Sequence, residues 1–132
     1  MSRDPVAVEH LRELGFSQYE ARAYVGLLRM SRPATGYALS NSTGIPQPKV
    51  YETLRRLVDK GVVVQVGSEP ARFVGVAPRQ VLSSLDQEFR QRLEDAEVDL
   101  SRLVVEDGAV EIMPVRRLAE PAPAPFHALR RA

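Results

Sequence analysis

The feature that most constrains the fold is a short helical segment, a glycine turn and a longer helical segment in direct succession. Thr35 to Ser42 has a helical pattern, and Thr35 is a residue type that caps helix N-termini. Thr43-Gly44 then interrupts the chain, and Ile45 supplies an apolar anchor for the turn. A second helix is predicted from Pro46 to Lys60, because proline is tolerated in a first helical turn and a glycine follows. This succession is typical of a helix-turn-helix.

Two further helices are predicted ahead of this unit. The first runs from Val6 to Leu14 and ends at Gly15. The second opens with Ser17 and Glu20, which have the spacing of a capping box. Its apolar residues continue at helical spacing until a Ser-Arg-Pro segment ends it. The predicted second helix of the helix-turn-helix also has one apolar face, formed by Val50, Leu54, Leu57 and Val58.

A β-hairpin is predicted directly after these helices. Val62 to Val66 is rich in β-branched residues, and Gly67 to Pro70 is a cluster of turn residues. Phe73 to Val76 then has the pattern of a return strand. A hairpin that follows a recognition helix is the wing of a winged helix, although a plain structural sheet edge is the alternative.

A long amphipathic helix is predicted from Pro78 to Val105. Its apolar residues recur at steps of three and four, with one irregular step between Phe89 and Leu93. A long helix with one narrow apolar seam requires a partner, and we expect a second copy of the chain. Packing of the seam onto its own domain is the alternative. The predicted dimer interface comprises Leu82, Leu85, Phe89, Leu93, Ala96, Leu100 and Leu103.

These segments together predict an α+β fold that is mainly helical. We expect a winged helix-turn-helix over residues 1–77 and a coiled-coil-like dimerisation helix over residues 78–107. Residues 108–132 are predicted to hold a short strand, Ala109 to Val115, and an extended Pro/Ala-rich tail.

The residue inventory argues against catalysis and against a metal or cofactor site. The chain has no cysteine, and its two histidines, His10 and His127, lie at opposite ends of the sequence. It contains no glycine-rich phosphate loop and no nucleophile–base constellation. We therefore expect no enzyme, no cofactor and no metal. An N-terminal signal region and a membrane-spanning apolar run are also lacking, so a cytoplasmic location is expected.

The charge is distributed unevenly along a chain whose formal net charge is only +1. From Pro46 to Ala77 five basic residues face three acidic ones, whereas from Pro78 to Asp107 four basic residues face eight acidic ones. DNA responds to the local field, which salt screens over about 8–10 Å. A basic reading face can therefore coexist with an acidic helix.

The predicted recognition helix supplies the candidate DNA contacts, because such a helix enters the major groove with its N-terminal residues at the base edges. Glutamine can pair with adenine, and lysine with guanine. Tyr51 fits either core packing or a phosphate contact, and each basic side chain also fits a simple solvated role. The base-reading candidates are Gln47, Pro48, Lys49 and Glu52. The candidates for phosphate or wing contacts are Thr35, Tyr51, Arg55, Arg56, Lys60, Ser68 and Arg72.

Three stretches carry a family resemblance: GFSQYEARAYVGLL, TGYALSNSTGIPQPKVYETLRRLVDKGVV and EPARFVGVAP followed by a long helix. From Leu11 to Leu103 the chain resembles the DNA-binding half of TrmB-like transcriptional regulators, many of which sense sugars. The resemblance implies a recognition helix at Pro46–Lys60, a wing tip at Gly67–Pro70 and a dimerisation helix at Pro78–Val105. Ala38, Gln47 and Pro48 depart from the family pattern. The resemblance does not extend to the separate sugar-binding domain of larger members, so a small-molecule effector stays open.

The function predicted on these grounds is that of a sequence-specific regulator of transcription. We expect it to bind double-stranded DNA as a homodimer, with the recognition helix in the major groove and the wing on the backbone or in the minor groove. The alternative is a winged-helix module that binds proteins within a transcription or chromosome-organising complex.

Overall fold

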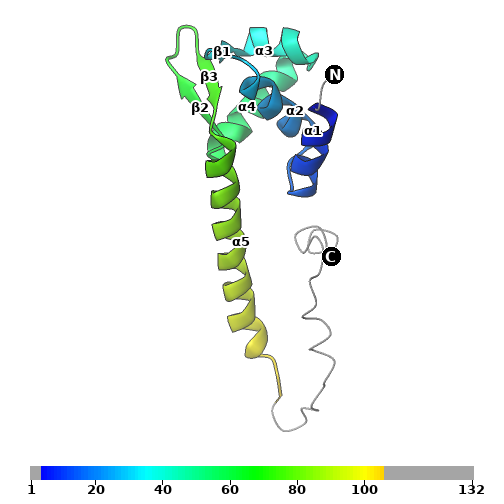
Figure 1. Ribbon diagram of the computed structural model, residues 1–132. Coiled ribbons are helices and arrows are strands. Elements are labelled where there is room, and N and C mark those ends of the chain that lie inside the picture. The colour runs from blue at the N-terminus through cyan, green and yellow to red at the C-terminus, as the bar shows by residue number, and fades with distance from the viewer. Residues whose placement is uncertain (1–3, 106–132) are drawn as a thin grey trace. The chain divides into compact units, whose positions relative to one another are not determined.

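The computed structural model describes residues 4–105, and Figure 1 shows their helices and strands. Two helices precede the helix-turn-helix, a small sheet accompanies it, and a long helix follows. The elements in chain order are α1 (Asp4–Glu13), α2 (Gln18–Leu28), β1 (Ala34–Thr35), α3 (Gly36–Thr43), α4 (Gln47–Asp59), β2 (Val63–Val66), β3 (Arg72–Gly75) and α5 (Pro78–Ser101). The predicted helical segments, the hairpin and the long helix are thus all present.

The capping box predicted for α2 is confirmed. The backbone N–H of Glu20 donates to Ser17 Oγ at 3.1 Å, and the N–H of Ser17 donates to Glu20 Oε1 at 2.9 Å. These bonds satisfy amides that have no helical partner in a first turn. Gly15 has a φ of 111°, which lets the chain turn sharply from α1 into this cap.

Helix α2 is the centre of the packed unit, because it contacts α1, α3, α4 and β3. Leu39 and Ile45 are fully buried in the helix-turn-helix, as are Val50 and Leu57 on α4. Gly26 allows the close approach of α2 to α3, since a Cβ there would lie 2.7 Å from Thr43 Cγ2.

The turn between α3 and α4 is fixed by hydrogen bonds as well as by packing. Thr35 caps α3, since its Oγ1 accepts from the N–H of Ala38 at 3.1 Å. Gly44 ends α3 with a φ of 80°, a left-handed conformation that favours glycine. Arg22 of α2 donates to the carbonyl oxygen of Thr43 at 2.7 Å and so binds the exposed end of the α3 backbone. The Thr35 cap, the left-handed Gly44 and the Arg22 hydrogen bond thus together fix α3 and the turn that leads into α4.

The sheet has one strand more than the predicted hairpin. Its order is β1-β3-β2, with all neighbours antiparallel. In β1, Ala34 pairs with Phe73 and Thr35 pairs with Arg72. Two residues are too few to show a strand periodicity, and their partner strand lies far along the chain. Only the tertiary structure therefore reveals that the wing is joined to the start of α3 (Figure 1).

The exit of the wing is tied to the helical core. The hydroxyl of Tyr24 donates to the carbonyl oxygen of Val76 at 2.6 Å, and burial raises the pKa of this tyrosine to about 12. The tyrosine is therefore a neutral donor at physiological pH. Its ring also packs beside Gly75, where a Cβ would lie 3.3 Å from Tyr24 Cε1.

Helix α5 begins at Pro78, as predicted, and ends at Ser101, four residues before the predicted end. Val104 and Val105 follow, and β-branched residues are weaker helix formers. The chain divides into compact units after Val81, which is buried, so most of α5 belongs to the second unit.

The strand and tail predicted over residues 108–132 lie outside the described residues. Between residues 4 and 105 no helix has the length and apolarity needed to cross a membrane.

Candidate nucleic-acid interface

Helix α4 has one face in the core and the other in solvent. Val50, Thr53 and Leu54 are buried on the core side, and Leu57 continues that side one turn later. Thr53 is a buried polar residue that the apolar pattern did not include. With about 3.6 residues per turn, the positions farthest from this face are 48, 52, 55 and 59.

The four base-reading candidates all lie on exposed surface in the N-terminal half of α4. Gln47 is the first helical residue, and Pro48 occupies the first turn, where its missing N–H costs nothing. Lys49 Nζ lies 3.9 Å from Glu52 Oε1, and both side chains are about half exposed. This loose pair can open, so both polar groups remain available to a ligand in solution.

Arg55 and Arg56 are both exposed, but they lie on different sides of α4. Arg55 is on the side opposite the core, one turn from Glu52. Arg56 is on the flank that faces the first turn of α2, where its positive charge helps to lower the pKa of Glu20. The two arginines are therefore not equivalent as candidate DNA contacts.

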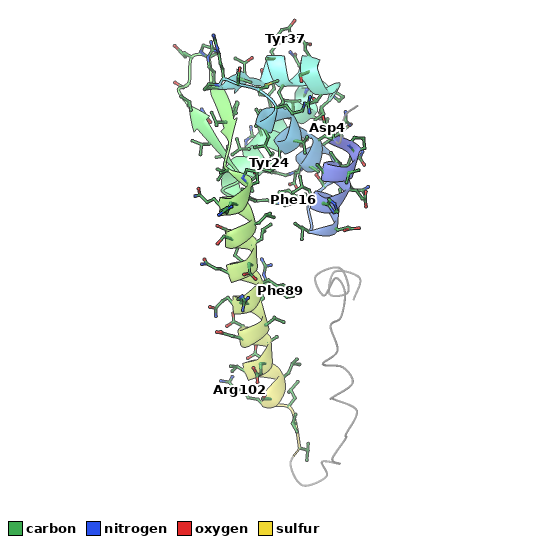
Figure 2. All side chains as sticks on the ribbon, viewed as in Figure 1. Asp4, Phe16, Tyr24, Tyr37, Phe89 and Arg102 are labelled. Atoms are coloured by element: carbon green, nitrogen blue, oxygen red, sulfur yellow. The ribbon has the colours of Figure 1, made fainter. Side chains whose placement is uncertain are left out.

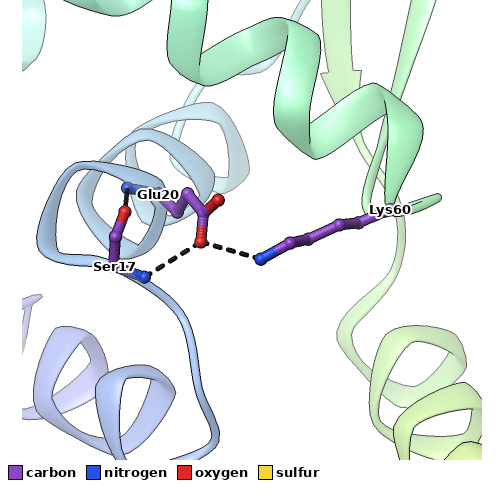
Figure 3. A network of polar contacts seen from close by, with 3 residues as sticks. All are labelled: Ser17, Glu20 and Lys60. Carbon is purple, nitrogen blue, oxygen red and sulfur yellow. Dashed lines mark hydrogen bonds and ion pairs between the residues drawn. The ribbon is translucent and has the colours of Figure 1, made fainter.

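Lys60, another candidate, has a partner inside the fold (Figure 3). Its Nζ lies 2.9 Å from Glu20 Oε1 and 5.2 Å from the centre of the Phe16 ring. Glu20 is 4% exposed. Burial alone would raise its pKa, but the hydrogen bond from Ser17 and the bond and charge of Lys60 lower it on balance. Lys60 thus joins the C-terminal end of α4 to the first turn of α2.

Tyr51 packs against the first turn of α3 and is also partly exposed. A Cβ on Gly36 would lie 2.5 Å from Tyr51 Cε1, so the ring fits only because residue 36 is glycine. The side chain remains 46% exposed. The two alternatives for Tyr51, packing and surface contact, are therefore compatible with each other. Its hydroxyl can donate to an oxygen of a ligand.

Tyr37 is an exposed aromatic residue that was not among the candidates predicted from the sequence. It is 59% exposed, and Figure 2 shows it at the outer edge of α3. It follows directly on the Thr35 cap and on Gly36, against which Tyr51 packs. The segment around Tyr37 has the pattern of any short amphipathic helix. No signal in the sequence therefore distinguished this tyrosine as exposed.

The strand register brings Thr35 and Arg72 together. They are paired across β1 and β3, and Arg72 also pairs with Val66 across the hairpin. Phe73 is buried, so the exposed Arg72 lies on the outer face of the sheet with Val64 and Val74. Ser68 is exposed in the turn of the hairpin. The start of α3 and the wing therefore form one continuous surface.

Among residues 4–105, no group of three or more His, Asp or Glu side chains could hold a metal ion. The described surface offers the exposed N-terminal half of α4, with Arg55 and Arg56 farther along that helix. It also offers a wing and the hydroxyls of two tyrosines, Tyr37 and Tyr51.

Comparison with known proteins gives a family. The sequence model described as "Sugar-specific transcriptional regulator TrmB" matches residues 11–79. The uncharacterized protein YrhO of Bacillus subtilis is 36% identical over 66% of this chain and 31% of its own length. The sugar-sensing regulator TrmBL1 of Pyrococcus furiosus is 28% identical over 95% of this chain and 37% of its own length. The chain thus spans about a third of the length of these relatives.

Solved structures agree with the family match. The structure of TrmBL2, described as an archaeal chromatin protein with a novel mode of DNA binding, matches with a TM-score of 0.70 and 27% identity. The match covers 90% of this chain and 47% of that one. The ST1889 protein of Sulfolobus tokodaii shares the fold, with a TM-score of 0.54 and 12% identity over 75% of this chain and 99% of that one.

Proposed function

The chain belongs to the TrmB family of transcriptional regulators, and from this premise we propose that it binds double-stranded DNA sequence-specifically as a homodimer. The family consists of regulators rather than enzymes. The observation that carries the proposal is the exposed N-terminal half of α4, together with a wing that is joined to the start of α3. The major groove of DNA is wide enough to accept such a helix.

In this proposal α4 reads bases and its surroundings hold the backbone. Gln47 and Lys49 face base edges. Pro48 and Glu52 belong to the same base-reading end of the helix. Arg55, Arg56 and Tyr51 contact phosphates farther along the groove, and Thr35 contacts a phosphate at the start of α3. Ser68 and Arg72 place the wing on the backbone or in the minor groove. Lys60 is left out, because its ammonium is bound to Glu20.

The apolar seam of α5, which continues to Leu103 just beyond the helix, supports the homodimer. Leu82, Leu93, Leu100 and Leu103 are exposed in the single chain. A second copy would cover them and would also supply a second recognition helix. Two such helices read half-sites about 34–36 Å apart, so we propose a pseudo-palindromic operator.

Selection of bound fragments from genomic DNA, followed by footprinting, tests the proposal. We expect a recurrent symmetric motif and two protected half-sites about one helical turn apart. Uniform protection of unrelated fragments would instead support sequence-independent coating of DNA. That outcome would contradict the operator but keep DNA as the ligand. A single asymmetric half-site would contradict the dimer.

A second candidate function is a protein-interaction module, which the near-neutral total charge and the acidic α5 favour. A mobility-shift assay at low and moderate salt distinguishes the two functions, because DNA binding weakens steeply with salt. Absence of a shifted band at both salt concentrations would reject the DNA proposal.

A further inference from the structure

Starting from the proposed homodimer, we propose that α5 pairs with α5 of a second copy in parallel and in register. Arg92 of each chain would then face Glu97 of its partner. The proposal adds the direction and the register of the helices to the statement that two chains associate. It rests on the spacing of the apolar seam, on the charges beside the seam and on ion pairs within α5.

The apolar seam consists of two similar blocks. Leu82, Leu85 and Phe89 are followed, eleven residues later, by Leu93, Ala96 and Leu100. An eleven-residue repeat, about 3.67 residues per turn, keeps an apolar stripe on one side of a helix that supercoils slightly. The exposed fractions of Leu82, Leu93 and Leu100 are 47%, 48% and 61%. A second copy in register places each of these layers against its own equivalent.

The charges beside the seam favour a parallel pair. Asp86 and Glu97 lie along one edge of the seam, eleven residues apart, and Arg92 lies along the other edge. Opposite edges meet in a parallel pair, and a residue faces the partner's residue five positions later. Arg92 therefore meets the partner's Glu97 twice, once on each side of the twofold axis.

An antiparallel pair would bring like charges together. In an antiparallel pair, each edge of the seam faces the same edge of the partner's seam. If the two seams overlap along their whole length, Asp86 lies close to the partner's Glu97. The same overlap would set Arg92 close to the partner's Arg92. Like charges at such positions oppose association, so they disfavour this direction.

Ion pairs inside α5 leave the two relevant residues available. Arg90 Nε lies 3.2 Å from Asp86 Oδ1, and Arg102 Nη1 lies 3.8 Å from Asp99 Oδ1. Within the described part of the chain, neither Arg92 nor Glu97 has an oppositely charged partner within 4.0 Å. The two charges that a parallel pair would use are thus among those that form no ion pair within α5.

A parallel pair also suits the proposed operator. Helix α5 begins at Pro78, two residues after the wing exit at Val76. Parallel pairing places both Pro78 residues at the same end of the coiled coil. Both DNA-binding units are then attached at that end, an arrangement compatible with two neighbouring half-sites.

Disulfide trapping tests the direction, since the native chain has no cysteine. Leu85→Cys and Leu100→Cys are made separately in the full chain and oxidised at low concentration. If the two helices are parallel and in register, each variant forms a disulfide between two identical chains. If neither variant does so but an equimolar mixture forms the mixed disulfide, the helices are antiparallel and the proposal is wrong, although the homodimer stands.

Sedimentation of the unmodified chain separates the other failure. A monomer at all concentrations would overturn the homodimer itself, and with it any pairing of α5. In a dimer, Arg92→Glu should raise the dissociation constant about tenfold, because each new glutamate faces the partner's Glu97 and the repulsion occurs twice. Arg92→Glu combined with Glu97→Arg should restore it to within about threefold. Glu94→Arg, away from the seam, is the matched control, and failure of the double variant to recover would contradict the Arg92–Glu97 pair.

Discussion

The ammonium of Lys60 lies 2.9 Å from the carboxylate of Glu20, so the last turn of α4 is joined to the first turn of α2. The same carboxylate closes the capping box with Ser17. One buried acid therefore both starts a helix and holds the far end of the proposed recognition helix. In the proposed DNA complex, this contact would act through the position of α4.

Lys60→Met should therefore destabilise the fold without removing a DNA contact. Because Glu20 is buried, loss of its charged partner costs about 1–2 kcal/mol in the free energy of unfolding, a value kept low because Lys60 is 45% exposed. The salt dependence of DNA binding should stay unchanged. Urea unfolding and titrations at several salt concentrations measure the two effects.

Lys49→Met is the matched control on the same helix. Lys49 has only a loose, exposed pair with Glu52, so stability should change by less than about 0.5 kcal/mol. A base contact would be lost, and DNA affinity should fall. A reduced salt slope for Lys60→Met would place its ammonium on a phosphate and contradict the positioning role.

The Glu20 contacts predict a specific pH dependence of stability. The folded-state pKa of Glu20 is lowered from 4.5, so the unfolded chain binds the proton first as pH falls. The stabilisation is complete above about pH 5.5 and is lost as pH falls through 4.5 towards the folded-state pKa. In Glu20→Gln this part of the pH dependence should disappear. Urea unfolding at stepped pH measures it, and parallel curves for both proteins would refute the assignment.

Gly26→Ala should destabilise the helix-turn-helix although alanine is the better helix former. Helix propensity favours alanine by about 1 kcal/mol. The added Cβ would however lie 2.7 Å from Thr43 Cγ2 and 3.0 Å from Leu39 Cδ1, and overpacking of this kind costs about 1–3 kcal/mol. Thermal unfolding should show a net loss. Thr43→Ser removes Cγ2 but keeps the hydroxyl, so the loss should shrink by about half in that background.

Leu93→Asp should dissociate the proposed dimer, whereas Val98→Asp should not. Both side chains are about half exposed on α5, with exposed fractions of 48% and 52%, but only Leu93 lies in the seam. A buried charge in the seam should raise the dimer dissociation constant more than about tenfold and weaken binding to paired half-sites. Analytical ultracentrifugation measures the constant. Equal behaviour of the two variants would show that the seam is not the interface.

Local structure was well predicted because its signals are local. The Ser17–Glu20 cap, the Gly44 turn and the end of α4 before Gly61 each depend on residues only a few positions apart. The apolar spacing of α4 identified its buried side in the same way. Family membership, too, followed from short motifs in the recognition helix and the wing.

Contacts between distant segments were decided by the tertiary structure alone. Nothing in the sequence indicates that Thr35 would pair with Arg72 in a third strand, or that Lys60 would bind Glu20 rather than face a ligand. A lysine on a helix has the same sequence pattern in either role. The difference is decided by which buried charge the packed chain brings within hydrogen-bonding distance, because that charge must be neutralised once water is excluded.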